Sequence, residues 1–143
     1  MKLLASVIFI GYLPFFPGTW VSILLSIWIW FWEPSFPWFL IFILVFFFAG
    51  VKISGLAERI WGHDSQKIVI DELMGMSVTL FLLPKNILFY ALGFILFRFF
   101  DIVKPLFIRK LETLPDGWGV MADDLLAGIY ANSAVQILIF ILR

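Results

Sequence analysis

Apolar runs separated by proline, glycine and charged residues constrain the fold of this chain more than any other feature of its sequence. The breaks contain Pro34, Pro37, Pro84 and Pro105, and proline cannot continue a helix. Most runs are close to or below the roughly 20 residues that an α-helix needs to cross a bilayer. The pattern predicts five helices, which cover about residues 21–32, 38–51, 66–83, 87–104 and 121–142.

The composition is typical of a protein that faces lipid. Of the 143 residues, 63% are apolar and only 14% are charged, whereas soluble domains are about half apolar and about a quarter charged. The predicted fold is all-α: a polytopic membrane helical bundle of about four to five short spans, with one domain over residues 1–143. A soluble helical domain with a large core is the alternative. The net charge of zero gives no indication of a nucleic-acid partner, and no oligomeric state is predicted.

The N-terminal segment resembles a signal peptide, because Lys2 precedes a short apolar stretch. However, Pro14 and Pro17 stand where a cleavage site of small residues would be expected, and no such site occurs. We therefore expect an interfacial or re-entrant N-terminal segment.

The charges are distributed unequally between the two sides of the predicted bundle. Five spans would put residues 1–18, 52–70 and 104–123 on one side. Eight of the ten Lys and Arg residues lie there or at the adjoining helix ends, and only Lys85 and Arg143 lie on the other side. The positive-inside rule makes the first side cytoplasmic. All carboxylates except Glu33 share that side, which the rule does not require.

Several of these charges fall inside predicted helices. Asp71 and Glu72 lie about two turns into the third helix, and Arg98 and Asp101 lie in the last turns of the fourth. Asp123 and Asp124 open the fifth, and Lys104 ends the fourth. Charges at such depth are costly unless they are paired, hydrated or bound to an ion, so they indicate a functional site.

The residue types favour phosphoryl chemistry on a lipid headgroup. Carboxylates are the ligands of hard cations such as Mg²⁺, and Arg98 and Lys104 suit phosphate oxygens. Thr19 opens the first helix after Gly18, and a helix N-terminus favours anions. The chain has no cysteine and a single histidine, His63. These counts exclude a thiol phosphatase and a phosphatase that needs two histidines.

Structural alternatives remain open for each candidate. Asp123 and Asp124 could complement a helix dipole, and Asp64 could cap a helix. Arg98 and Asp101 could form an ordinary intrahelical pair, and His63 could be solvated. Adjacent acids such as Asp71 and Glu72 within an apolar helix have no comparable structural role. In a different functional class, the same acids could serve an ion or proton carrier, but they gather near one face and not across the bilayer.

Four segments in order carry a resemblance to a known family. They are PGTW at residues 17–20, D-x4-IVIDE-x2-G at 64–75, FRFFDIVKP at 97–105 and GWGVMADDLLAGIYA at 117–131. With these segments the chain resembles the phosphatidylglycerophosphatase A family of bacterial membrane enzymes. The resemblance implies Mg²⁺-dependent hydrolysis of the phospholipid phosphatidylglycerophosphate to phosphatidylglycerol and inorganic phosphate. It also implies a multi-pass protein of the bacterial cytoplasmic (inner) membrane, with its active site facing the cytoplasm.

The resemblance extends to individual residues. The family's polar motif positions fall on Asp64, Asp71, Glu72, Arg98, Asp101, Lys104, Asp123 and Asp124. We expect Asp71, Glu72, Asp123 and Asp124 to hold metal and act in catalysis, and Thr19, Arg98 and Lys104 to bind phosphate. Asp101 is expected to be catalytic without an assigned role, and Asp64 and His63 are further candidates. Water and an aspartate both remain open as the attacking group. The CDP-alcohol phosphotransferases space their acids differently, and an Asp-x-Asp pair of the haloacid type is absent.

Overall fold

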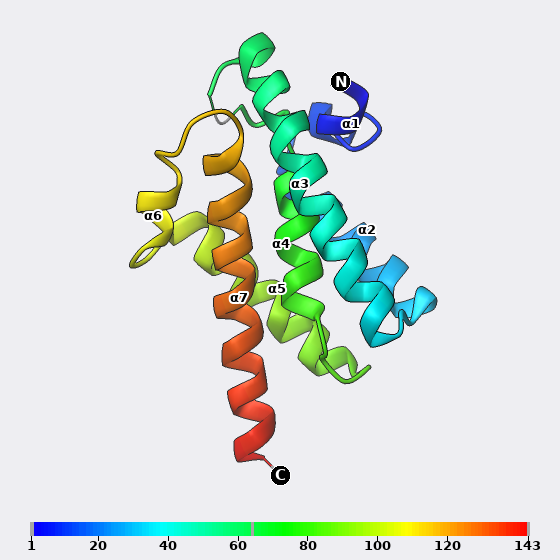
Figure 1. The fold of residues 1–143 in the computed structure, drawn as a ribbon. Helices are drawn as coiled ribbons and strands as arrows, with labels where there is room; N and C mark the ends of the chain where they lie inside the picture. The colour runs from blue at the N-terminus through cyan, green and yellow to red at the C-terminus, as the bar shows by residue number, and fades with distance from the viewer. Residues whose placement is uncertain (1, 64, 143) are drawn as a thin grey trace.

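The computed structural model describes residues 2–63 and 65–142, and these residues form helices and turns without a strand. The all-α prediction is therefore confirmed (Figure 1). The elements are α1 (Lys2–Ala5), the 3₁₀ helix η1 (Ile10–Tyr12), α2 (Pro17–Trp32), α3 (Phe36–Trp61), α4 (Ile70–Leu80), α5 (Ile87–Val103), α6 (Ile108–Leu111) and α7 (Trp118–Ile141). The short helix α4 lies at the centre, where it contacts α2, α3, α5 and α7.

Two of the expected helices are longer than the apolar pattern indicates. Pro17 occupies the first turn of α2, where its missing N–H needs no partner. The helix α3 continues past its apolar run through Lys52 and Glu58 to Trp61, and Gly62 caps it with a positive φ of 91°. By contrast, α5 begins and ends within one residue of its prediction.

The beginning of α4 differs from the prediction of a helix that starts near residue 65. The helix starts at Ile70, and its N-cap Val69 provides no side-chain cap. Val69 donates its N–H to the Ala5 carbonyl, so this stretch pairs with the N-terminal segment instead of continuing the helix. β-Branched residues such as Ile68 and Val69 also favour extended backbone. The expected cap at Asp64 lies outside the described residues, and Asp71 and Glu72 fall in the first turn of α4.

The helix α7, by contrast, begins earlier in the sequence than predicted. It starts at Trp118, three residues before the expected position, and has no acid in its first turn. Asp123 and Asp124 consequently lie in the second turn, where the attraction of the helix dipole has weakened. The dipole interpretation therefore fits Asp71 and Glu72 better than the two aspartates for which it was considered.

The N-terminal segment folds across the end of the bundle where α3 terminates (Figure 1). It contains only α1 and η1, of four and three residues, which are too short to cross a membrane. Ala5 is fully buried, and Gly11 packs against the backbone carbonyl of Lys67. The segment is thus a cover over one end of the molecule, consistent with the expected interfacial or re-entrant segment.

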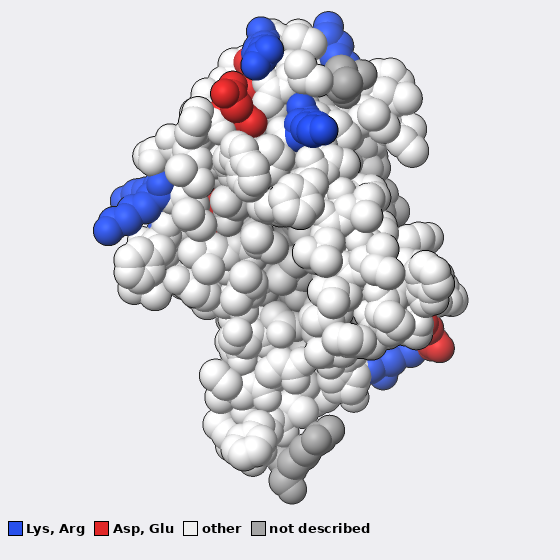
Figure 2. Space-filling view, viewed as in Figure 1, with Lys and Arg blue, Asp and Glu red and all other residues white. Residues whose placement is uncertain are grey.

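The outer surface is mostly apolar. Within the described residues, α3 and α7 are long and apolar enough to cross a membrane, and α2 is a shorter apolar helix. Two such helices are fewer than the four to five spans expected. Large apolar side chains nevertheless stand exposed along α2, α3, α5 and α7, and Figure 2 shows a broad uncharged belt between the charges at the top of the view and those at the lower right. Soluble monomers rarely expose so much contiguous apolar surface, which favours a membrane protein.

Candidate active site

The ends of three helices meet at one level of the bundle. The helices α4 and α7 start near this level, and α5 ends there (Figure 1). Gly75 and Gly128 lie one helical turn beyond Asp71 and Asp124, respectively, and both occupy the crossing of α4 and α7. A Cβ on Gly75 would lie 2.7 Å from the Asp124 carbonyl oxygen, and one on Gly128 would collide with the Gly75 carbonyl. The two glycines therefore let the helices approach closely enough to bring their acids together.

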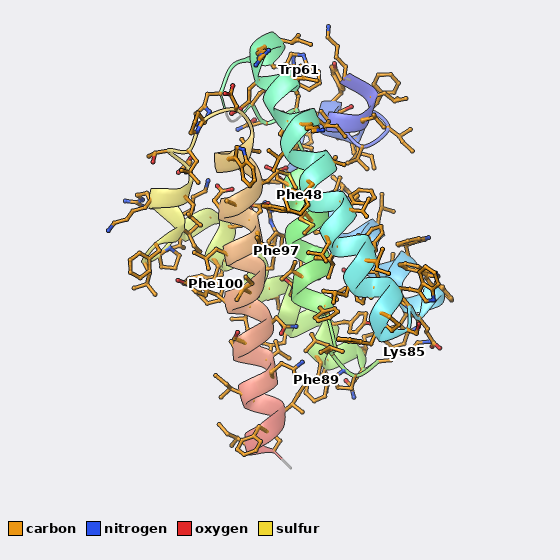
Figure 3. The ribbon with its side chains drawn as sticks, viewed as in Figure 1. Phe48, Trp61, Lys85, Phe89, Phe97 and Phe100 are labelled. Carbon is orange, nitrogen blue, oxygen red and sulfur yellow. The ribbon has the colours of Figure 1, made fainter. Side chains whose placement is uncertain are left out.

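Beneath this crossing lies a buried aromatic side chain of the core. Phe97 is fully buried and points from α5 into the centre of the bundle (Figure 3). Its ring faces Gly75, where a Cβ would overlap it. Phe97 thus packs against α4 next to its acidic first turn. Arg98, the next residue of α5, lies beside Glu72.

Three carboxylates converge at this point, and we refer to Asp71, Glu72 and Asp124 as the carboxylate trio. One oxygen from each lies within 4.8 Å of the others. Asp71 and Asp124 are 7% and 3% exposed. A buried oxygen of each member, Asp71 Oδ1, Glu72 Oε2 and Asp124 Oδ2, has no hydrogen-bond partner in the structure.

These unpartnered oxygens fit a metal ion. Asp101 and Asp123 add further negative charge around Asp124. The carboxylates of the trio therefore repel one another and these two neighbours. Buried charges of one sign require a compensating cation, and oxygen ligands at this separation are those that hard divalent cations prefer. The carboxylate trio could therefore hold a divalent ion.

Arg98 supplies positive charge at the edge of the carboxylate trio. Its Nη1 lies 2.7 Å from Asp101 Oδ2 and 4.0 Å from Glu72 Oε1. The spacing of three residues along α5 thus forms the intrahelical pair that was considered as an alternative. The same guanidinium also reaches the carboxylate trio, so Asp101 can orient Arg98 toward a bound anion.

Lys104 and Asp123 form a second charged group, which is separate from the carboxylate trio. Lys104 Nζ donates to Asp123 Oδ2 at 2.6 Å and lies 3.2 Å from Glu112 Oε1. The structure places Lys104 against Asp123; the predicted contacts of Lys104 with phosphate and of Asp123 with metal stay predictions. The sequence of two adjacent aspartates could not indicate which of them pairs with Lys104, because that pairing depends on where α5 ends.

A cavity of about 760 Å³ opens next to these groups. Glu72 and Arg98 line it from the bundle, and residues 11–18 and 65–67 line it from the outside. Gly18, in the first turn of α2, lies so close to Glu72 that a Cβ would overlap its carboxylate. Thr19 is the next residue of α2, adjacent to the cavity lining, and no described contact joins it to the carboxylate trio.

The two remaining candidates are placed differently. His63 Nδ1 lies 2.5 Å from Glu58 Oε1, and the other oxygen of Glu58 accepts the backbone N–H of Gly117. His63 therefore belongs to a link between the end of α3 and the start of α7. Asp64 lies outside the described residues.

Sequence reasoning gave no site role to two residues that line the cavity. The sequence places Gly18 only just before the first helix, and its contact with Glu72 depends on tertiary packing. Lys67 was counted only for orientation, although a cation four residues before Asp71 could have indicated a polar loop beside the acids.

The chain is similar to proteins of known families. A family model described as phosphatidylglycerophosphatase A matches residues 3–139. A protein of Bacteroides thetaiotaomicron, provisionally named phosphatidylinositol-3-phosphatase, is 42% identical over 130 residues, which cover 85% of this chain and 82% of that protein. No solved structure matches the chain at a significant level.

Two similar proteins carry the name of the matching family. Phosphatidylglycerophosphatase A of Escherichia coli is 37% identical over 124 residues, or 83% of this chain and 72% of that protein. Phosphatidylglycerophosphatase A of Haemophilus influenzae is 43% identical over 96 residues, which cover 65% of this chain and 59% of that protein. With a family match across almost its whole length and a carboxylate trio beside an arginine, the chain belongs to the phosphatidylglycerophosphatase A family of phosphatases.

Proposed function

We propose that this protein is a Mg²⁺-dependent, multi-pass membrane phosphatase that hydrolyses phosphatidylglycerophosphate to phosphatidylglycerol and inorganic phosphate. The observation that carries the proposal is the carboxylate trio, with its unpartnered buried oxygens next to Arg98 and an open cavity. The relatives named phosphatidylglycerophosphatase A supply the lipid.

The carboxylate trio would hold the ion, and Arg98 would bind the phosphoryl group. A bound Mg²⁺ polarises phosphoryl oxygens and lowers the pKa of a bound water. Arg98, oriented by Asp101 at 2.7 Å, donates hydrogen bonds to the phosphate oxygens as negative charge builds in the transition state. A carboxylate then either accepts the proton of an attacking water or attacks phosphorus itself. In both routes the bond between phosphorus and the glycerol oxygen breaks, and this oxygen takes up a proton as phosphatidylglycerol leaves. Only the second route forms a covalent phosphoaspartyl or phosphoglutamyl enzyme, which water then hydrolyses to release inorganic phosphate.

Phosphate release from defined lipids tests this proposal. The purified protein in mixed micelles is given phosphatidylglycerophosphate with Mg²⁺ or with EDTA, and phosphatidylinositol 3-phosphate in a parallel reaction. We expect Mg²⁺-dependent release from phosphatidylglycerophosphate and a rate at least about tenfold lower from the inositol lipid. Lys85→Ala, at the opposite end of the bundle (Figure 3), is the matched control and should keep the wild-type rate.

Two results would contradict the proposal. Equal release in EDTA would refute the role of the metal. Faster release from phosphatidylinositol 3-phosphate would move the assignment to the activity named for the Bacteroides relative.

The proposal includes four to five spans of the cytoplasmic membrane, with the cavity on the cytoplasmic side. The exposed apolar belt supports the spans, and the distribution of Lys and Arg supports the orientation. The chain lacks cysteine, so single cysteines at Lys85 and Arg109 can report on the topology. A membrane-impermeant maleimide applied to intact spheroplasts should label the cysteine at position 85 and not the one at 109. The reverse pattern would invert the orientation.

A further inference from the structure

The cavity next to the carboxylate trio contains a second cation that the proposed mechanism does not use. Lys67 and Arg98 both line this cavity. Arg98 is mostly buried, with 17% of its side chain exposed, whereas Lys67 is exposed. Arg98 therefore lies at the base of the cavity, beside Glu72, and Lys67 lies toward its mouth.

Two aromatic rings hold the position of Lys67. Its Nζ lies 5.5 Å from the centroid of Tyr12 and 6.0 Å from that of Trp61, distances at which a ring face attracts a cation. The two rings meet edge to face at 6.0 Å, and Trp61 marks the end of α3 (Figure 3). Three separate segments of the chain thus fix this lysine at the mouth of the cavity.

The charge of Lys67 is also available to a ligand. Among residues 2–63 and 65–142, no carboxylate forms an ion pair with Lys67, whereas Arg98 pairs with Asp101 and Lys104 with Asp123. Phe15 and Phe16, exposed on the same cavity wall, supply an apolar edge that suits the lipid interface. A cation and an apolar edge at one opening match the boundary between a phospholipid's headgroup and its acyl chains.

The substrate assigned above carries two different phosphates. Its terminal phosphomonoester is hydrolysed, and its phosphodiester, next to the diacylglycerol, stays intact. We propose that Lys67 binds this phosphodiester while Arg98 and the carboxylate trio engage the phosphomonoester. The inference rests on the proposed function and adds a residue that selects lipids with two phosphates over lipids with one.

Inhibition by the two products separates the two phosphate sites. Phosphatidylglycerol retains only the phosphodiester, and inorganic phosphate reports on the monoester site. In neutral mixed micelles, Lys67→Ala should raise both the KM for phosphatidylglycerophosphate and the inhibition constant of phosphatidylglycerol about tenfold. The kcat and the inhibition constant of inorganic phosphate should stay within about twofold of wild type.

Two variants control for charge and for folding. Lys67→Arg should restore the KM to within about threefold of wild type, because it keeps a cation at the mouth of the cavity. Lys110→Ala removes a lysine that does not line the cavity and contacts Phe107 instead. It should leave all four constants unchanged, because Lys110 lies outside the proposed phosphodiester site. A general attraction between lysines and anionic lipid would instead weaken equally in both variants.

The outcomes distinguish this inference from the function on which it rests. An active enzyme whose Lys67→Ala variant keeps its KM would refute the phosphodiester site alone. Equal changes in the inhibition constants of phosphate and phosphatidylglycerol would refute it as well. A wild-type protein that releases no phosphate from phosphatidylglycerophosphate would refute the proposed function and, with it, this site.

Discussion

Asp123 and Asp124 are neighbours in α7 and equally buried, at 3% exposure each, yet their surroundings are opposite. Asp123 accepts a hydrogen bond from Lys104 at 2.6 Å and another from the backbone N–H of Asp124. Asp124 lies against Asp71 and Glu72, and its Oδ2 has no hydrogen-bond partner. Asp123 is paired with a lysine, whereas Asp124 lies among other carboxylates, and one of its oxygens has no hydrogen-bond partner among the described residues.

The difference arises from helix geometry. Successive residues of an α-helix point about 100° apart, so adjacent acids face different neighbours. Asp124 faces α4, and Asp123 faces the end of α5 and Lys104. Burial alone therefore does not separate a candidate metal ligand from an ion-paired aspartate; the charges of the neighbouring side chains do.

The largest effect is expected from Asp124→Asn. Removing a ligand of the proposed metal should lower phosphate release by about 1,000-fold or more. The same substitution should leave the melting temperature in EDTA unchanged or raise it, because it removes a buried charge of the repelling group. Phosphate release and thermal unfolding measure the two quantities. A variant that loses stability and activity together would indicate a structural role for Asp124 instead.

A smaller effect is expected from breaking the pair of Lys104 and Asp123. Lys104→Met should destabilise the protein by about 3 kcal/mol, because it leaves a buried aspartate without its cation. The double variant Lys104→Met/Asp123→Asn should recover most of this loss, which denaturation of both variants in detergent would measure. Additive losses would show that the two side chains do not act as a pair.

The activity of the same double variant sharpens the assignment of Lys104. Recovery of activity with stability would make Lys104 a partner of Asp123 only. A stable but inactive double variant, beside an active Asp123→Asn single variant, would support the predicted contact between Lys104 and phosphate.

The smallest effect is expected from Gly18→Ala. Its Cβ would overlap the Glu72 carboxylate, so Glu72 must turn away from the carboxylate trio. We expect kcat to fall about tenfold and the Mg²⁺ concentration for half-maximal activity to rise, with little loss of stability in a helix that favours alanine. An unchanged Mg²⁺ requirement would contradict the contact.

Much of the site could be predicted because its residues are unusual in an apolar chain. Asp71 and Glu72 have no ordinary role within a hydrophobic helix, and the structure places them with Asp124. The Arg98–Asp101 spacing likewise predicted a pair on one side of α5, and the structure contains that pair. The cost of burying a charge is large enough for single residues to indicate the site.

Other features could not be predicted because they depend on tertiary contacts. The start of α4 at Ile70 depends on a hydrogen bond between Val69 and Ala5, two residues far apart in the sequence. The partner of Asp123 depends on where α5 ends. The position of Lys67 depends on contacts with Tyr12 and Trp61, which come from two other segments of the chain. Local patterns reveal which residues carry charge, and the fold determines which of them meet.

Metal binding to the two aspartate variants tests the central comparison most directly. Mn²⁺ can replace Mg²⁺ at oxygen sites, and its electron paramagnetic resonance signal counts free ions without requiring activity. In protein stripped with EDTA, Asp124→Asn should weaken Mn²⁺ binding by about tenfold or more, and Asp123→Asn should bind within about threefold of wild type. Equal weakening by both substitutions, or wild-type binding by Asp124→Asn, would contradict the separation of the carboxylate trio from the Lys104–Asp123 pair.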